Sequence, residues 1–307
     1  MLATAASKLP LGEQWAYEFK WDGVRVLAQV SAKSVRLYSR AENEVTTAYP
    51  EIVSALSDAG PVILDGEVVA FVDGRPSFEA LQTRMHVRVA ADARALAAST
   101  PATFVVFDML GRDGVDLSRH SYADRRAELE TWFTASQPAS ITLSPSFADG
   151  PATEAAAREH DLEGVVAKRL TSKYTPGART PDWQKLRFVR TGDFVVIGAE
   201  APATGSQELS SLVLAQYTGG HLEFAGKVGS GISGAVARTL TKALEFRPDC
   251  PIPEQPPASP GRVVRWVEPA VVVEVEFSAW TSEGRLRHPV YRRMRTDKSP
   301  AEAEGDR

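Results

Sequence analysis

The first 190 residues alternate strand-like and helical segments, and several of the strands alternate apolar with polar side chains. Strand-like runs occur at residues 15–30, 35–38, 62–71, 103–110 and 164–168, and helical patterns occur at 49–58, 78–82, 90–98, 122–135 and 152–160. Such alternation is typical of half-solvated antiparallel strands, whereas strands in a doubly wound parallel sheet are apolar on both faces. We therefore predict an antiparallel α+β domain over residues 1–190.

The pattern changes near residue 193. Short strands at 194–199, 211–217 and 222–228 precede a helical segment at 234–246, a proline-rich stretch at 248–260, and strands at 263–269 and 271–278. Roughly five short strands with a helix after the third are typical of a small barrel of the oligonucleotide-binding (OB) type. We predict an OB-fold domain over residues 191–298, a disordered tail over 299–307, and a hinge at residues 191–193.

The composition excludes several classes of protein. The single cysteine, Cys250, excludes an intrachain disulfide and a cysteine-rich zinc module, and the five histidines lack metal-ligand spacing. No apolar stretch approaches the roughly 20 residues that cross a bilayer, and no basic segment with a long apolar run marks a signal peptide. We expect a cytoplasmic protein without a membrane partner.

The charge distribution is uneven although the net charge is only −4. Residues 168–190 carry seven Lys or Arg against Asp182 alone, and residues 285–298 carry six against Asp297 alone. Phosphate contacts act over about a Debye length, so local cationic stripes suit a polyanion-binding groove on an otherwise acidic protein. For either stripe alone, a solvated surface is the alternative.

Residues 18–25, Glu-Phe-Lys-Trp-Asp-Gly-Val-Arg, carry the most distinctive chemistry. Alternation along a strand places Glu18, Lys20 and Asp22 on one face, and Gly23 opens a turn. A lysine between two carboxylates is either a salt-bridged surface residue or a nucleophile. With an unperturbed pKa of about 10.4, it needs help from its surroundings to react.

Further polar clusters follow within the first domain. Arg40 closes a strand, where it can reach phosphate or sugar oxygens. Residues 64–67, Leu-Asp-Gly-Glu, place two carboxylates on one strand face, available to a ribose hydroxyl or a divalent metal. Phe107 lies near a strand end, where its ring can stack on a purine. Each cluster alone is more often structural than functional.

Two more clusters come late in that domain. Glu163 stands at the start of a buried strand, and Lys185 and Arg187 lie two residues apart on one strand face, where they can clamp an anion.

Residues 229–234, in the second domain, formally match the dinucleotide fingerprint G-x-G-x-x-G. The following helix leads into prolines rather than a second parallel strand, so we interpret that match as a strand-to-helix turn.

Together and in this order, these motifs resemble the nucleotidyltransferase motifs of ATP-dependent polynucleotide ligases and, more distantly, of mRNA capping enzymes. Arg295-Thr-Asp297-Lys298 resembles the motif that closes the ligase barrel domain. The approach to Lys20, Trp-Ala-Tyr-Glu-Phe-Lys-Trp-Asp-Gly, is most similar to bacterial end-joining DNA ligases. The resemblance implies an ATP-grasp-like, antiparallel-sheet nucleotidyltransferase domain followed by an OB domain.

The resemblance also implies a reaction through a covalent lysyl-AMP. Lys20 would attack the α-phosphorus of ATP, AMP would pass to the 5′-phosphate of a DNA break, and the 3′-hydroxyl would displace it. Mg²⁺ or Mn²⁺ near Glu67 and Glu163 would neutralise charge on phosphorus. The residues implied in ATP binding are Glu18 and Phe107 for adenine, Arg25, Arg40 and Glu67 for ribose and phosphate, Lys185 and Arg187 for the α-phosphate, and Arg295 and Lys298 for pyrophosphate.

One departure from the family is visible, because Arg187 stands where a second lysine is usual. We expect an altered rate rather than lost activity, since guanidinium clamps phosphate but is not equivalent to ammonium. The implied partners are nicked or broken duplex DNA and an end-bridging protein, and the expected form is a monomer in the bacterial cytosol or nucleoid that acts in DNA repair, recombination and non-homologous end joining. The alternatives are an RNA ligase, a capping-type nucleotidyltransferase, and a non-catalytic single-strand-binding OB protein.

Overall fold

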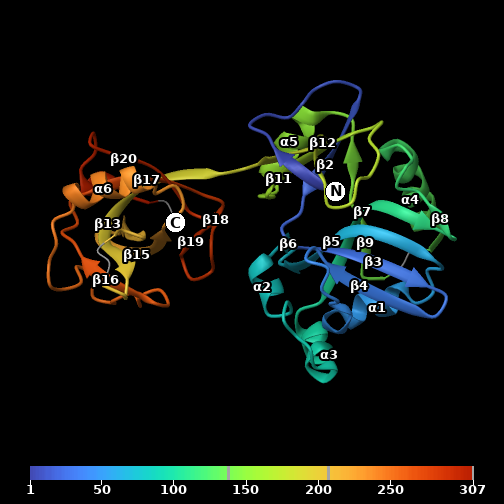
Figure 1. The fold of residues 1–307 in the computed structure, drawn as a ribbon, viewed down its shortest axis with the longest axis horizontal. Helices are drawn as coiled ribbons and strands as arrows, with labels where there is room; N and C mark the ends of the chain where they lie inside the picture. The colour runs from blue at the N-terminus through green and yellow to red at the C-terminus, as the bar shows by residue number, and fades with distance from the viewer. Residues whose placement is uncertain (137–138, 206–207, 306–307) are drawn as a thin grey trace. The chain divides into compact units, whose positions relative to one another are not determined.

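The structure, a computed structural model, describes residues 1–136, 139–205 and 208–305 of the chain (Figure 1). The chain divides into two units, Met1–Phe188 and Val189–Arg307. Each unit has its own sheets and its own apolar core. No helix among the described residues is long and apolar enough to cross a membrane.

One sheet of the first unit contains the strands of the largest apolar core. In order, these are β4 (Ser34–Ser39), β3 (Val24–Ser31), β5 (Val62–Val72), β7 (Ala102–Arg112) and β8 (Val115–Asp116), with β6 (Arg75–Pro76) paired to β5 and β9 (Ile141–Leu143) paired to β7. The helical elements of this part are η1 (Thr46–Ala48), α1 (Pro50–Leu56), α2 (Phe78–Gln82), α3 (Ala90–Ser99) and α4 (Tyr122–Ser136). Leu64 and Ile52 are fully buried there, and burying a side chain of that size contributes about 1.5–3 kcal/mol.

The second sheet of the first unit has one helix-covered face and one polar face. Its order is β1 (Leu2–Ala5), β12 (Arg179–Arg187), β11 (Gly164–Arg169), β2 (Trp15–Lys20) and β10 (Ser146–Phe147). Helix α5 (Gly150–Glu159) packs on β2 and β11, where Trp15, Tyr17 and Val165 are buried together. Alternation then turns the even-numbered residues of β2 to the opposite face.

The second unit is built on a curled antiparallel sheet. Its strands are β15 (His221–Val228), β14 (Ser211–Thr218), β13 (Arg190–Pro202), β17 (Val272–Phe277) and β20 (Val290–Met294), and β16 (Arg262–Trp266) also pairs with β13. The remaining elements are α6 (Gly234–Ala243), β18 (Ala279–Trp280), β19 (Leu286–Arg287) and η2 (Pro300–Glu302). Long β13 pairs with β17 through its first half and with β16 through its second, so the sheet bends into a half-barrel with an apolar core on each side.

The α+β class and the small barrel are confirmed, and three local expectations differ. Residues 15–30 form two strands rather than one, because Gly23 lies against β5; a Cβ there would be 2.1 Å from the Val68 carbonyl oxygen. Asp22 therefore lies outside the strand face predicted for it. The hinge predicted at residues 191–193 lies inside β13, paired with β17.

The predicted disordered tail is also ordered as far as the structure describes it. Residues 300–302 form η2, and Ala303 is only 1% exposed because it packs into a core of the second unit. Glu304 pairs with Tyr217 as an isolated bridge. Composition predicts disorder here, but one buried alanine and one bridge hold the segment on the barrel. Residues 306–307, which the prediction also covers, lie outside the described residues.

Candidate active site

Three neighbouring strands bring four predicted site residues onto one face of the β2-containing sheet. Lys20 on β2 lies opposite Gly164 on β11, and Gly164 lies opposite Arg187 on β12. Two residues further along β11, Val166 lies opposite Glu18 on β2 and opposite Lys185 on β12, so these two side chains share the face of Lys20 and Arg187. Because directly paired residues of antiparallel strands share a face, the predicted nucleophile and the predicted phosphate clamp point to the same side.

Glu163 connects the nucleophile to one of these cations. Lys20 Nζ donates a hydrogen bond to Glu163 Oε2, and both side chains are 17% exposed. Glu163 Oε1 lies 3.2 Å from Arg187 Nε. The adjacent Gly164 has a φ of +154°, and a Cβ there would be 2.0 Å from the Leu186 carbonyl oxygen. Only glycine allows β11 and β12 to approach so closely beside the ion pair.

Glu67 on β5 belongs to the other sheet of the first unit and interacts electrostatically with Lys20. Burial raises the pKa of Glu67 to about 8; the charges of Lys20 and Arg25 oppose this shift, and those of Glu163 and Asp65 add to it. An ordinary glutamate is ionised at neutral pH, whereas Glu67 retains its proton to about pH 8. Such a desolvated carboxylate is stabilised by an added cation.

Lys185 lies in a crowded cationic environment. Burial lowers the pKa of Lys185, and the positive charges of Arg187 and Lys20 lower it further, while Glu163 opposes the shift. Lys185, Arg187 and the Lys20 amine therefore share one face, where Glu163 pairs with two of them and Glu18 is already paired with Lys168. A cluster with excess positive charge of this kind is suited to an anion such as a phosphate.

The predicted adenine acceptor, Glu18, is already bonded inside the protein. It is only 2% exposed and accepts hydrogen bonds from the Tyr122 hydroxyl and from Lys168 Nζ, which lies 2.6 Å away. The Lys168 ammonium also lies 4.4 Å from the centre of the Phe107 ring and 4.5 Å from that of Trp183. Burial lowers the pKa of Lys168, and the Glu18 charge opposes this effect.

Sequence reasoning missed Lys168 as a site residue, because no local sequence spacing indicates its contact with Glu18. The sequence identified it only as a member of a basic stripe. When β2, β11 and β12 are placed in register, Lys168 lies on the same sheet face as Glu18 and Lys185. That register, rather than the sequence spacing, makes the contact visible.

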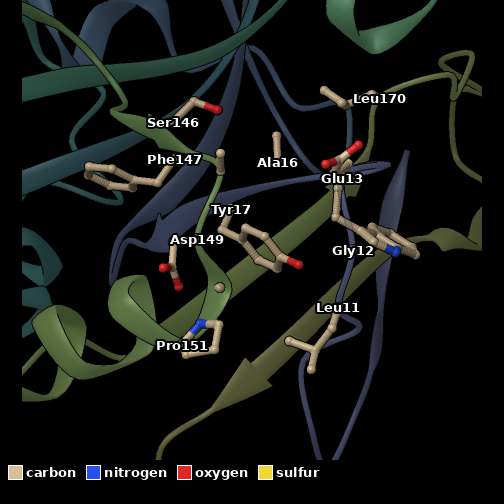
Figure 2. Close-up of a pocket in the computed structure, with 13 residues that line it drawn as sticks. Leu11, Gly12, Glu13, Ala16, Tyr17, Ser146, Phe147, Asp149, Pro151 and Leu170 are labelled. Carbon is tan, nitrogen blue, oxygen red and sulfur yellow. The ribbon is translucent and has the colours of Figure 1, made fainter.

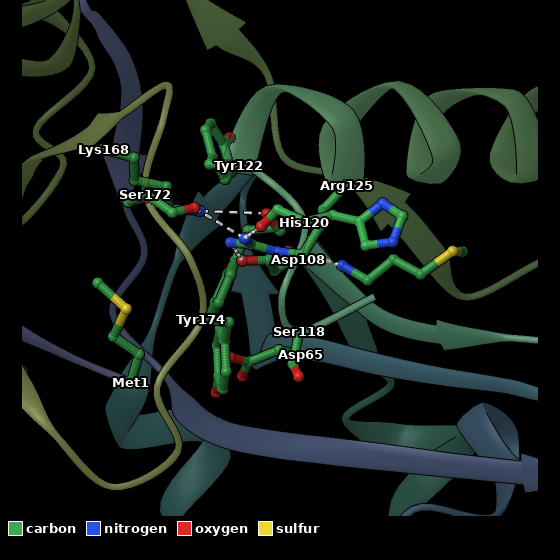
Figure 3. A network of polar contacts seen from close by, with 12 residues as sticks. Met1, Asp65, Asp108, Ser118, His120, Tyr122, Arg125, Lys168, Ser172 and Tyr174 are labelled. Atoms are coloured by element: carbon green, nitrogen blue, oxygen red, sulfur yellow. Dashed lines mark hydrogen bonds and ion pairs between the residues drawn. The ribbon is translucent and has the colours of Figure 1, made fainter. Parts of the chain in front are cut away.

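Arg25 forms part of a polar network with Asp65, one of the two carboxylates of residues 64–67, and with Tyr174, which the sequence did not single out. Figure 3 shows the part of this network around Asp65, Tyr174, Asp108 and Arg125. The Arg25 guanidinium donates to both oxygens of Asp65, at 2.9 and 2.6 Å, and to the Tyr174 hydroxyl at 3.2 Å. The same network contains a fully buried pair in which Arg125 donates to both Asp108 oxygens at 2.8 Å. Arg25 is thus held by the protein itself.

The other predicted residues lie elsewhere. Arg40 is exposed directly after β4 and, within the described part of the chain, forms no ion pair. Arg295 and Lys298 belong to the second unit, where both contact the carboxylate of Asp193.

A cavity of about 630 Å³ lies on the α5 side of the β2-containing sheet (Figure 2). Its lining includes Leu11, Tyr17, Phe147 and Asp149, and none of the predicted site residues is among the described residues that line it. The constellation around Lys20 lies on the opposite sheet face. Across the described residues, no three His, Cys, Asp or Glu side chains are grouped to hold a metal by themselves.

The sequence matches two family models. The family described as "ATP dependent DNA ligase domain" matches residues 1–187. The family described as "ATP dependent DNA ligase C terminal region" matches residues 205–298. The two matches cover most of the chain, and the first contains Lys20, Glu163 and Arg187.

Curated relatives and solved structures agree with these matches. The chain is 37% identical to the "Multifunctional non-homologous end joining DNA repair protein LigD" of Mycobacterium tuberculosis over 98% of this chain and 39% of that protein. It is 33% identical to the LigD protein of Pseudomonas aeruginosa over 100% of this chain and 36% of that protein. The chain thus spans less than half the length of these relatives. The structure "mycobacterial DNA ligase D complexed with ATP and MES" has a TM-score of 0.55 at 34% identity, covering 99% of this chain and 98% of that one.

Proposed function

We propose that this chain, which belongs to the family of ATP-dependent DNA ligases, seals 5′-phosphate/3′-hydroxyl breaks in DNA through a lysyl-AMP at Lys20. The observation that carries the proposal is the single sheet face that holds Lys20, Lys185 and Arg187, with Glu163 bonded to the lysine. Similarity to bacterial LigD proteins along nearly the whole chain supports a role in end-joining repair.

The residues around Lys20 suit attack on the α-phosphorus of ATP. The Lys20 nitrogen forms the N–P bond as the bond to the pyrophosphate oxygen breaks, and its second proton then passes to water. Before the attack, the Lys20 ammonium must give up its first proton. Glu163 Oε2, which already accepts a hydrogen bond from Lys20, is positioned to receive it. Lys185 and Arg187 would hold the α-phosphate and stabilise its developing charge.

The residues present fit a divalent cation. Glu67 is a carboxylate whose raised pKa reflects desolvation, and Glu163 interacts with it electrostatically. Magnesium is commonly held by one or two carboxylates together with substrate phosphates, so these two residues suffice with ATP present. Bound there, Mg²⁺ or Mn²⁺ would neutralise charge on the reacting phosphate.

The remaining nucleotide contacts follow from the same unit. Glu18 would accept from the adenine amino group while Lys168 and Tyr122 fix its carboxylate. Phe107 would stack on the base. Arg25, oriented by Asp65, and Arg40 would serve the ribose and phosphates. Arg295 and Lys298 of the second unit would orient the pyrophosphate leaving group.

The wider assignment is part of the same proposal. Residues 1–190 serve as the nucleotidyltransferase domain and residues 191–298 as the OB domain. The chain acts as a monomer on nicked or broken duplex DNA in the bacterial cytosol, and an end-bridging protein brings it to its substrate. The basic segment at residues 168–190 supports contact with DNA phosphates.

Covalent labelling tests this function. Wild-type protein incubated with α-labelled ATP and Mg²⁺ or Mn²⁺ should take up label and then seal nicked DNA, whereas Lys20→Ala should do neither. Exposed Lys33→Ala is the matched control and should label as the wild type does. Parallel reactions with GTP and with nicked RNA distinguish a capping-type enzyme and an RNA ligase. Wild-type protein that stays unlabelled with every metal and pH tested contradicts the proposal.

A further inference from the structure

Arg295 and Lys298 share one carboxylate, that of Asp193. Arg295 Nη1 donates to Asp193 Oδ1 at 2.9 Å and to Oδ2 at 3.1 Å, and Lys298 Nζ donates to Oδ2 at 2.6 Å. Asp193 is 14% exposed, so this contact is largely shielded from water. Asp193 lies in β13, and its two partners follow β20. The contact therefore joins parts of the second unit that are more than 100 residues apart in the sequence.

The guanidinium of Arg295 has little capacity left for another anion. Besides the two bonds to Asp193, its Nε and Nη2 donate to Asp297 at 2.9 and 2.8 Å. Arginine offers five N–H donors in a fixed plane, and all three nitrogens of Arg295 already donate to these two carboxylates. A phosphate can engage Arg295 bidentately only if one of the carboxylates leaves.

The local charges also balance. Ion pairs join the cations Arg293, Arg295 and Lys298 to the carboxylates Asp193, Glu274 and Asp297. Three positive charges thus meet three negative ones, and the cluster offers no excess positive charge to a polyanion. Asp297 lies two residues from Arg295 and moves with it, whereas Asp193 belongs to another strand. Asp193 is therefore the carboxylate that can be exchanged.

We propose that Asp193 competes with the pyrophosphate moiety of ATP for Arg295 and Lys298 and must be displaced before lysine adenylation. The inference rests on the proposed function, which assigns these two cations to the leaving group. In this arrangement Asp193 holds the cations in a neutral resting cluster and receives them again when pyrophosphate departs. Asp193 therefore lowers the rate of lysine adenylation and takes no part in sealing an already adenylated nick.

Asp193→Asn tests the inference, because the amide keeps the shape of the side chain and removes its charge. Single-turnover adenylation at subsaturating ATP should become faster by about fivefold, the scale of one partly exposed ion pair. Pyrophosphate-driven reversal of the lysyl-AMP should accelerate to a similar extent. Sealing of a pre-adenylated nick should stay at the wild-type rate.

Glu276→Gln is the matched control. It removes a carboxylate from the neighbouring strand β17 that pairs with Arg292, outside the cluster, and should leave adenylation unchanged. Asp193→Ser is the second variant, in case the amide disturbs folding, and thermal unfolding verifies that each variant is folded. The serine variant should also adenylate faster than the wild type.

The outcomes separate the two proposals. If the wild type labels and the folded Asp193 variants label more slowly or at the same rate, Asp193 is no competitor and this inference is wrong while the proposed function stands. If the Asp193 variants also lose sealing of the pre-adenylated nick, the restriction to the first step is wrong. A wild type that takes no label overturns both.

Discussion

The Lys20 ammonium and the Glu163 carboxylate form an ion pair. The proposed nucleophile and a proposed metal ligand are therefore partners that must separate, or transfer a proton, before the lysine can attack phosphorus. Arg187 contacts the same carboxylate at 3.2 Å, so a replacement partner is already in place when Lys20 leaves.

Glu163→Gln should lower the rate of lysine adenylation by about two orders of magnitude, because it removes both the proton acceptor and a metal ligand. Glu159→Gln, at the exposed end of α5, should have no effect. Single-turnover labelling with α-labelled ATP measures both variants. An adenylation rate of Glu163→Gln within about threefold of the wild type would remove Glu163 from the mechanism.

Glu67 predicts a pH dependence of metal binding. Because burial raises its pKa to about 8, protons compete with the metal at neutral pH, and metal affinity should rise with pH until about 8. Titration with Mn²⁺ at several pH values measures this. The same rise in Glu67→Gln would assign the effect to another group.

The same group predicts a change in stability for the metal-free protein. The folded state binds a proton at Glu67 more tightly than the unfolded state, whose glutamate has an ordinary pKa of about 4.3. The stability contribution is therefore fully present below that value and is lost as pH rises toward the folded pKa of about 8. Melting temperatures over this range should fall less in Glu67→Gln than in the wild type.

Lys168→Met should destabilise the first unit by about 3–5 kcal/mol, because it leaves Glu18 charged and buried without its partner. The double variant Glu18→Gln/Lys168→Met should recover part of that loss, since no uncompensated charge remains. Denaturant unfolding of the single and double variants gives the coupling energy. Strictly additive effects would show that the two side chains do not stabilise each other.

Arg187→Lys should retain adenylation within about tenfold of the wild type, whereas Arg187→Ala should lose more. The side chain is 54% exposed, so a shorter cation can still reach a phosphate near Lys20. ATP-concentration series separate binding from rate. Equal losses in both variants would mean that the planar guanidinium itself is required.

Local sequence patterns located several helices and strands of the fold. The pattern at residues 78–82 corresponds to helix α2, and that at 62–71 to strand β5, because periodicity directly reports which face is buried. Gly23 broke a predicted strand since close packing against Val68 depends on the neighbouring sheet, which periodicity does not describe.

The candidate site was predictable in its residue types and not in its pairings. Lys20, Glu163 and Arg187 are found from motif order, but their shared face depends on the register of β2, β11 and β12. The contact of Lys168 with Glu18 depends on the same register. The contact of Asp193 with Arg295 spans 102 residues, and no local pattern indicates it.

Two glycines flank the nucleophile: Gly164 lies opposite Lys20 on the neighbouring strand, and Gly23 follows Lys20 by three residues. Neither glycine has space for a methyl group. Mutational libraries aimed at a new nucleotide preference should therefore leave both glycines untouched. Diversity is better directed to Phe107, where the base would sit, while Glu18 and Lys168 should be varied only together because they form a buried ion pair.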